Sequence, residues 1–175
     1  MILATALAGC SSKPKEPDVP DLIGDLKSGD EVKRGKANLA LMDAGALAVP
    51  ALIEMLEGPD PVLRARAAGT LYGMGARGGA AAPALAVLLA DADTDVRLAG
   101  VMALENMGAA AAPAVPALVK ALKDKEGFVR QRAVIALGNV GPGARSAVPA
   151  LAEAAKRDEI RSSAEEAIRK IQSRQ

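Results

Sequence analysis

The sequence contains no histidine among its 175 residues. Histidine is the commonest general base and the commonest metal ligand in proteins, so its absence argues against acid–base catalysis and against a metal site. A single cysteine, Cys10, excludes an internal disulfide and a cluster of thiolate metal ligands. Aromatic residues make up 1% of the chain, which leaves Ala, Leu, Val, Ile and Met to build any core. We therefore expect no catalytic residues, no cofactor and no bound metal.

The charge of the chain is balanced. It has 22 Lys and Arg residues against 21 Asp and Glu residues, for a formal net charge of +1. A nucleic-acid-binding protein needs a clustered basic excess, so we expect no nucleic-acid partner. Half of the residues are hydrophobic, and the abundance of alanine favours helices whose backbones pack closely. The composition thus indicates an all-α fold.

The sequence is organised as a repeat. Prolines in the same local context recur at intervals of 30, 33, 33 and 33 residues, and they are Pro20, Pro50, Pro83, Pro116 and Pro149. An arginine follows each proline, 14 residues later in four copies and 12 later in the last, and the five are Arg34, Arg64, Arg97, Arg130 and Arg161. Such a period is typical of a solenoid, in which each unit packs only on its neighbours.

Each repeat has the pattern of two helices. The first, named helix B here, begins at the proline and carries a leucine two residues later. The second, named helix A, begins near the arginine and carries a small residue three positions later and an aliphatic residue seven positions later. Apolar residues at this spacing form one helical stripe. Four copies then have a glycine where a left-handed residue is expected to end the helix, and these are Gly45, Gly75, Gly108 and Gly141.

These repeating sequence positions resemble those of HEAT repeats, in particular the bacterial phycobilisome-lyase HEAT-like type. The resemblance rests on the recurring Val-Pro-Ala-Leu, the acid before Val-Arg and the Ala-Leu-Gly-x-x-Gly, and it covers about 150 of the 175 residues. It implies a right-handed α-solenoid of about five two-helix repeats over residues 20–175, with the B helices lining the concave side. Polar residues on the first and last helices are typical of solenoid caps, so we expect a complete repeat domain.

The first ten residues have the pattern of a secretory signal peptide. Met1–Ala8 is a short apolar run, and Leu7-Ala8-Gly9-Cys10 resembles the lipobox of bacterial lipoproteins. The resemblance implies that Cys10 is lipidated and anchors the chain in the bacterial cell envelope, on the periplasmic or outer-membrane side. Residues 11–19 are polar and proline-rich, which predicts an extended linker. The alternative is a cytoplasmic protein with an idle cysteine, since no Lys or Arg precedes the apolar run.

An acidic residue stands four positions before each of the first four arginines, and these acids are Asp30, Asp60, Asp93 and Glu126. One interpretation makes each acid–arginine pair a general acid with an anion clamp. The favoured interpretation is structural, because the motif recurs in every unit whereas a catalytic site is a single irregular cluster. Each acid is then expected to cap helix A and to offset the arginine in its first turn. The five arginines would form a structural ladder along the solenoid.

The candidate interaction face is the side of the B helices that is turned away from their apolar stripe. We assign to it seven residues, which are Glu54, Val87, Ala90, Lys120, Lys123, Glu153 and Lys156. Its centre is mildly apolar and its flanks are charged, a pattern that suits a peptide or partner helix but that a solvated face also produces. Phe128 takes the place of an aspartate in the preceding unit, so we expect it to be exposed as an anchor for a partner or to cover a seam between units.

The sequence therefore predicts a non-enzymatic scaffold or adaptor that binds a protein or peptide partner on the concave face while a lipid tethers it to a membrane. One rival hypothesis, suggested by the family, is a bilin-attaching lyase or a subunit of one. The absence of histidine and the scarcity of aromatic residues to hold a tetrapyrrole argue against it. The other rival is a soluble regulatory HEAT module in the cytosol.

Overall fold

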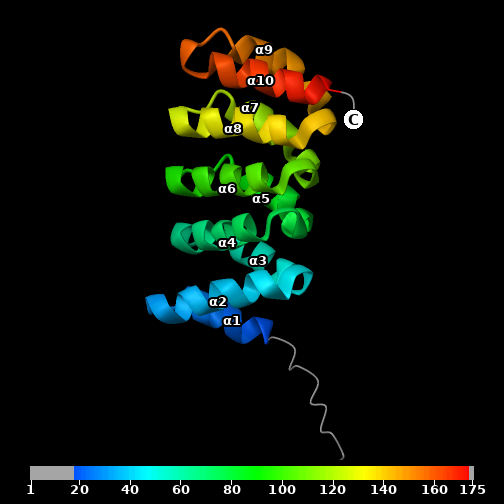
Figure 1. The fold of residues 1–175 in the computed structure, drawn as a ribbon. Coiled ribbons are helices and arrows are strands. Elements are labelled where there is room, and N and C mark those ends of the chain that lie inside the picture. Colours follow the sequence, from blue (N-terminus) through cyan, green and yellow to red (C-terminus); the bar gives the residue numbers. More distant parts are fainter. Residues whose placement is uncertain (1–17, 174–175) are drawn as a thin grey trace, which may run out of the picture.

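The computed structural model describes residues 18–173, and over this range it is built of helices with no strand. Ten α-helices and five short 3-10 helices follow one another in the described range, and the paired helices stack into an elongated solenoid (Figure 1). This confirms the predicted all-α solenoid of about five two-helix repeats. The predicted signal segment, with Cys10, and residues 11–17 of the predicted linker lie outside the described residues.

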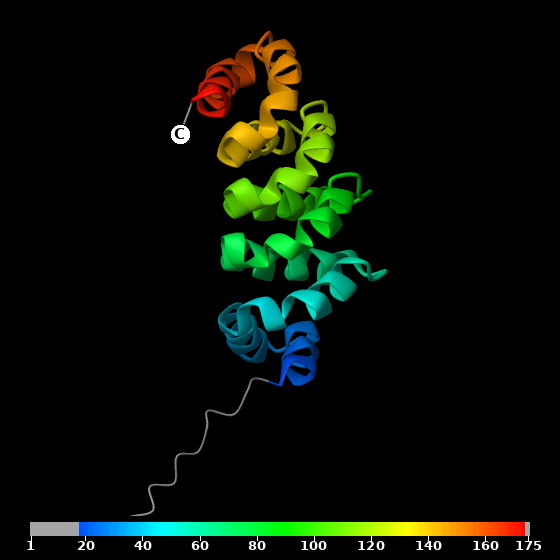
Figure 2. The same ribbon diagram turned by 90° about the vertical axis from the view of Figure 1, so that its right-hand side faces the viewer.

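The helices form two columns, one of B helices and one of A helices, which lie side by side along the stack (Figure 2). The B helices are short, and they are α1 (Val19–Lys27), α3 (Val49–Leu56), α5 (Ala82–Leu88), α7 (Val115–Ala121) and α9 (Val148–Ala154). The A helices are longer, and they are α2 (Glu31–Ala44), α4 (Pro61–Met74), α6 (Thr94–Met107), α8 (Gly127–Val140) and α10 (Arg161–Gln172). The repeating prolines occupy the second residue of every B helix, where a missing N–H leaves no helical hydrogen bond unmade.

Three aspartates cap the N-termini of A helices, as expected. Asp30 accepts hydrogen bonds from the N–H groups of Val32 and Lys33, at 2.9 and 3.2 Å, and Asp60 and Asp93 cap α4 and α6 in the same way. The prediction is wrong for Glu126, whose side chain makes no capping bond to α8. Its carboxylate sits one methylene further from the backbone than that of aspartate, so the compact cap is not formed.

The glycine at the end of each of the first four A helices adopts a positive φ, between 55° and 66°. Its ψ lies between −139° and −128°, which is outside the left-handed helical region that the sequence pattern predicts. This mirror image of the extended region is open to glycine alone. The chain then enters a 3-10 helix that leads directly into the next B helix, and these are η1 (Gly45–Leu47), η2 (Gly75–Ala81), η3 (Gly108–Ala114) and η4 (Gly141–Ala147). The fifth, η5 (Asp158–Ile160), precedes α10.

The core runs along the axis between the two columns. The repeating leucines of both helices are fully buried, and they include Leu41, Leu71, Leu104 and Leu137 on the A helices and Leu52, Leu85, Leu118 and Leu151 on the B helices. Neighbouring A helices pack directly against one another, whereas neighbouring B helices touch little. The spacing of the B helices therefore leaves room for grooves between them.

One stretch of the described range, Thr94–Ala121, has the length and the apolar composition of a membrane span. In the structure it comprises α6, η3 and α7, and 44% of its most apolar window is buried inside the solenoid. Buried core helices pass the same test of length and composition, so this stretch is explained as part of the repeat core.

Candidate protein-binding groove

The repeating arginines join adjacent units. Arg64 donates from Nε and Nη2 to the two carboxylate oxygens of Asp91, at 2.8 and 3.0 Å. Arg97 holds Asp124 in the same way, at 2.8 and 3.2 Å, and Arg130 of α8 pairs with Glu159 of η5. Each of these acids belongs to the unit after the arginine. The expectation that each arginine is offset by the acid four residues before it is therefore wrong.

Each of these three arginines also holds the turn inside its own unit. Nη1 of Arg97 donates to the carbonyl oxygens of Asp91 and Ala92, at 3.1 and 3.2 Å. The corresponding Nη1 atoms of Arg64 and Arg130 donate to the carbonyls six and five residues earlier, over 2.8 to 3.0 Å. One guanidinium thus fastens the turn between helices B and A and reaches a carboxylate of the next unit. We call each such arginine–carboxylate pair a rung.

The aspartates of the Arg64 and Arg97 rungs have lowered pKa values. Burial alone would raise the pKa of Asp124, but the side-chain hydrogen bonds from Arg97, the N–H of Glu126 and the charge of Arg97 outweigh burial and hold that pKa below its ordinary value. The pKa of Asp91 is lowered by the equivalent balance with Arg64. The hydrogen bond to Asp124 raises the pKa of Arg97. Both rungs are therefore held as charged pairs.

The two outer arginines of the predicted ladder lie differently. Arg161 is the first residue of α10 and pairs with Asp158, three residues earlier, at 2.6 Å. Among residues 18–173, Arg34 donates only to backbone carbonyls, those of Ser28 and Gly29, at 3.5 Å each. Within the described residues, the inter-unit rungs are those of Arg64, Arg97 and Arg130.

The predicted interaction face is exposed. All seven residues assigned to it lie on B helices or on the turn after one, with their side chains accessible to solvent. The structure brings three of them together, namely Lys123, Glu153 and Lys156, around one groove. The other four, Glu54, Val87, Ala90 and Lys120, do not line this groove. Phe128 is also exposed, with 74% of its surface accessible.

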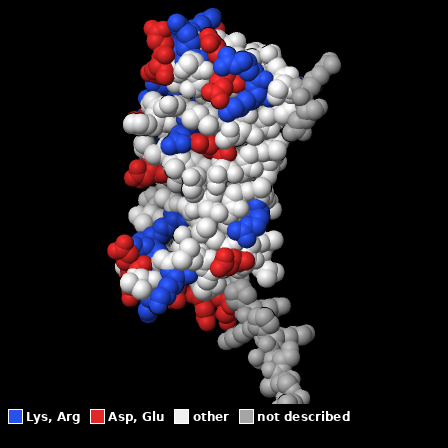
Figure 3. Space-filling view, viewed as in Figure 1, with Lys and Arg blue, Asp and Glu red and all other residues white. Residues whose placement is uncertain are grey.

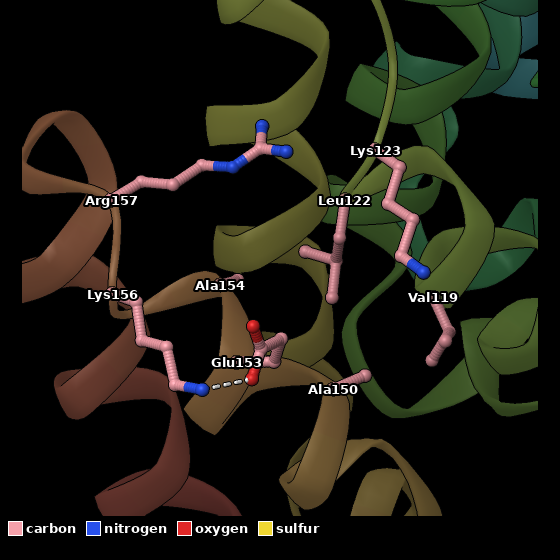
Figure 4. Close-up of a pocket in the computed structure, with 8 residues that line it drawn as sticks. All are labelled: Val119, Leu122, Lys123, Ala150, Glu153, Ala154, Lys156 and Arg157. Carbon is pink, nitrogen blue, oxygen red and sulfur yellow. Dashed lines mark ion pairs between the residues drawn. The ribbon is translucent and has the colours of Figure 1, made fainter.

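The groove lies between α7 and α9 and has a volume of about 370 Å³. Its floor is apolar and consists of Val119, Leu122, Ala150 and Ala154. Charged side chains surround this floor, with Lys123 on one side and Lys156 and Arg157 on the other, while Glu153 stands between them and pairs with Lys156 (Figure 4). Three cations and one carboxylate give the rim a net charge of +2.

Electrostatics keep Glu153 ionised within this rim. The hydrogen bond from Lys156, together with the charges of Lys156 and Lys123, lowers the pKa of Glu153 despite a small opposing effect of burial. Because Glu153 neutralises one of the three cations, Lys123 and Arg157 carry the charge that remains available to an incoming group.

Arg157 was not among the predicted residues, although the repeat contains a signal for it. The position eight residues after the proline is aspartate in two consecutive units, at Asp91 and Asp124, and is Arg157 in the next. This substitution replaces a rung carboxylate by a cation, so Arg130 pairs with Glu159 instead. The position at which the repeating aspartate is replaced by arginine is thus one that lines the groove and forms no rung.

The face over the A helices has a different character. Its charged residues gather toward the two ends of the solenoid, whereas the band over α6 is largely uncharged (Figure 3). Asparagines connect adjacent A helices here, since Asn106 donates to the Tyr72 carbonyl at 2.7 Å and Asn139 donates to the Glu105 carbonyl at 3.2 Å. The close packing and these bonds assign a mainly structural role to the seams between α4, α6 and α8.

Paired helices, an aliphatic core and repeating inter-unit rungs define the chain as an α-solenoid repeat protein. Residues 81–169, just over half of the chain, match the family model of HEAT repeats. The protein belongs to the HEAT-repeat family. A search of curated protein sequences finds no match.

Solved structures share the fold at low sequence identity. One chain from the complex of CpcE and CpcF of phycocyanin lyase from Nostoc sp. PCC7120 is 22% identical, with a TM-score of 0.68 over 85% of this chain and 96% of that one. A designed armadillo repeat protein in complex with the peptide (KR)4 is 22% identical, with a TM-score of 0.65 over 91% and 84%. Computationally designed armadillo repeat proteins for modular peptide recognition give a TM-score of 0.61 at 22% identity, over 86% and 80%. At these identities the likeness shows the fold.

Proposed function

We propose that this protein is a non-enzymatic scaffold that binds a protein partner in the groove between α7 and α9. The observation that carries the proposal is the combination of an apolar floor, formed by residues such as Leu122 and Ala154, with a cationic rim. Recognition surfaces pair a buried apolar anchor with polar contacts that fix its orientation. Solenoids related in fold include proteins described as binding peptides, which supports this use of a repeat surface.

The groove favours a particular chemistry in the partner. A volume of about 370 Å³ accommodates a few side chains, so a short segment rather than a whole domain would enter it. Lys123 and Arg157 flank the apolar floor on opposite sides. The matching ligand is therefore a peptide segment with one or two aliphatic side chains flanked by Asp or Glu.

Site-specific cross-linking tests the location. A photoreactive amino acid at Ala150, on the groove floor, is expected to give one discrete adduct with a partner when irradiated in the native cells. The same amino acid at Ala109, exposed on η3, is the matched control and is expected to give none. An adduct from both positions, or from Ala109 alone, would contradict the assignment of the groove.

We further propose that a lipid on Cys10 tethers this scaffold to a bacterial envelope membrane. The support is the lipobox-like Leu7-Ala8-Gly9-Cys10 and the polar, proline-rich residues after it. One acyl chain gives only marginal binding to a bilayer, so a stable tether needs two or more. Metabolic labelling with a fatty acid should mark the native chain and not Cys10→Ser, and equal labelling of both would remove the anchor. A native chain found in the soluble fraction would favour the cytosolic module instead.

A second candidate is a subunit of a bilin lyase, and the specific observation in its favour is the fold shared with the phycocyanin lyase complex. The chain has no histidine and only one tyrosine and one phenylalanine, which leaves few groups to hold or activate a tetrapyrrole. Titration with a bilin distinguishes the two candidates. The scaffold predicts unchanged absorption and fluorescence spectra, and a saturable spectral shift would favour the lyase.

A further inference from the structure

The rungs of the solenoid share one geometry. In Arg64 and Arg97, Nη1 donates to carbonyls of the turn that precedes helix A, while Nε and Nη2 together hold both oxygens of an aspartate. The planar guanidinium fits a carboxylate in this bidentate manner, which adds geometric specificity as well as energy. Each rung is thus a preformed carboxylate site that the next unit fills.

The first unit has the arginine without the acid. Nη1 of Arg34 points to the carbonyls of Ser28 and Gly29, as in the other rungs. The described residues place no carboxylate oxygen within 4.0 Å of its guanidinium. The cause lies in the repeat, because the position eight residues after the proline, which is Asp91 and Asp124 in later units, is Gly58 in the unit that follows Arg34. Nε and Nη2 of Arg34 therefore have no carboxylate from the described part of the chain.

Arg34 borders an open cleft. The cleft has a volume of about 350 Å³ and lies in the seam between α2 and α4, where these two A helices pack less closely than any later pair. Arg66 of α4 lines it too, with Nη1 held by the carbonyls of Leu26, Lys27 and Ser28 at 3.3 to 3.4 Å. Gly35 and Gly69 form part of its wall, and apart from the adjoining backbone of their own helices no atom lies within 4 Å of where their Cβ atoms would be.

We propose that this cleft binds a carboxylate of an acidic segment of a partner protein, which completes the missing rung of Arg34 in trans. Two guanidinium groups supply the attraction, and the later rungs show that the arrangement around Arg34 selects a carboxylate. Glu31 also lines the cleft, and its negative charge disfavours a multiply charged anion such as phosphate relative to a single Asp or Glu side chain. This site lies at the opposite end of the solenoid from the α7–α9 groove and does not depend on it.

The substitution Gly58→Asp tests the proposal by filling the site from within. The hydrogen bonding suits it, because the N–H of Gly58 bonds to the carbonyl three residues earlier, as those of Asp91 and Asp124 do, and its φ is not positive. A Cβ at this position lies 3.3 Å from the Met55 carbonyl oxygen, a tight contact that Gly58→Asp and Gly58→Asn share. Gly58→Asn has nearly the same size without the charge. The probe is a fluorescein-labelled hexaglutamate peptide, and its binding is followed by fluorescence anisotropy at low ionic strength, where charge pairing is least screened.

The wild type and Gly58→Asn are expected to bind hexaglutamate equally, whereas Gly58→Asp and Arg34→Gln weaken binding at least about tenfold. Gly58→Asp is also expected to raise the melting temperature above that of Gly58→Asn. Equal binding by the wild type and Gly58→Asp, or no binding by the wild type, overturns the proposal. Gly58→Asp keeps the test decisive even where Arg34→Gln folds poorly.

A matched control separates this site from the α7–α9 groove, which is also cationic. The double variant Lys123→Glu/Arg157→Glu inverts the positive charge of the groove rim and is expected to keep the component of hexaglutamate binding that Gly58→Asp abolishes. Loss of that component in the double variant would assign the binding to the groove and refute the cleft.

Discussion

Arg97 and Asp124 form the most deeply buried charged pair in the described part of the solenoid, with side chains only 5% and 9% exposed. The two lie 27 residues apart in the sequence and belong to consecutive units. Asp124 also accepts a hydrogen bond from the N–H of Glu126, at 2.9 Å. One carboxylate therefore orders the turn of its own unit while it receives the arginine of the unit before, so stacking and turn formation are coupled.

This coupling predicts a large cost for removing the acid. Asp124→Ala leaves Arg97 buried without its partner, and breaking a buried pair in this way costs about 3–5 kcal/mol. Glu105→Ala is the matched control, because Glu105 pairs with Arg132 across the same seam but with side chains 18% and 42% exposed, where a pair contributes about 0–1 kcal/mol. Urea unfolding measures both. Equal destabilisation by the two substitutions would contradict the structural role of the rung.

The rungs also predict a dependence of stability on pH. The pKa values of Asp91 and Asp124 lie below their ordinary value of 3.8 in the folded protein, because hydrogen bonds and charge from Arg64 and Arg97 outweigh burial. A depressed pKa stabilises the fold above the unfolded value and loses that contribution as pH falls through the folded value. The melting temperature of the wild type should therefore drop below about pH 4. The drop should be smaller in Asp91→Asn/Asp124→Asn, which is already less stable at pH 7, and parallel curves would contradict this assignment.

The aliphatic core predicts the effect of Leu104→Ala. Leu104 is fully buried on α6, in the middle of the stack, and truncation of such a leucine costs about 2–5 kcal/mol through lost burial and a residual cavity. Leu39→Ala, at a position 62% exposed on α2, serves as the control and should cost under about 1 kcal/mol. Thermal unfolding followed by circular dichroism distinguishes them. An unchanged melting temperature for Leu104→Ala would mean that the helical register is wrong.

Backbone conformation predicts opposite results for two glycine substitutions, one at the end of an A helix and one inside a B helix. Gly108 has φ 57° and ψ −129°, a conformation that costs a residue with a side chain about 1–3 kcal/mol. Gly24 lies inside α1 with open space around its Cβ direction, so Gly24→Ala should stabilise by about 0.5–1 kcal/mol. Chemical denaturation of Gly108→Ala and Gly24→Ala measures both signs. Stabilisation by Gly108→Ala would contradict the turn described here.

Much of the fold could be predicted because solenoid contacts repeat with the sequence. The proline, leucine and glycine columns each mark an element boundary or a core position, and the structure places them at equivalent points of successive units. The rung partners could not be read in the same way. Asp91 lies 27 residues after Arg64, and only the stacking of one unit on the next brings the two together. The 3-10 helices were also missed, because Ala-rich stretches after a glycine have no distinct pattern.

The candidate site was predicted in part for a related reason. Periodicity identified which side of each B helix faces solvent, and so it found Lys123, Glu153 and Lys156. It did not identify the groove, which depends on how far α7 and α9 stand apart. Arg157 was not predicted, because the pattern of the repeat gives the shared residue at each position, and here aspartate changes to arginine in one unit.

The most direct test of the proposed scaffold function is the yield of the photo-cross-link from Ala150 after charge reversal in the groove. The variant Lys123→Glu/Arg157→Glu inverts the cationic rim, and Lys33→Glu/Arg77→Glu makes the same change in net charge at exposed positions away from it. Melting temperatures should show that both variants stay folded. A groove that binds an acidic, apolar segment predicts that the first variant loses the adduct and the second keeps it. An adduct of equal yield in both variants would contradict this function.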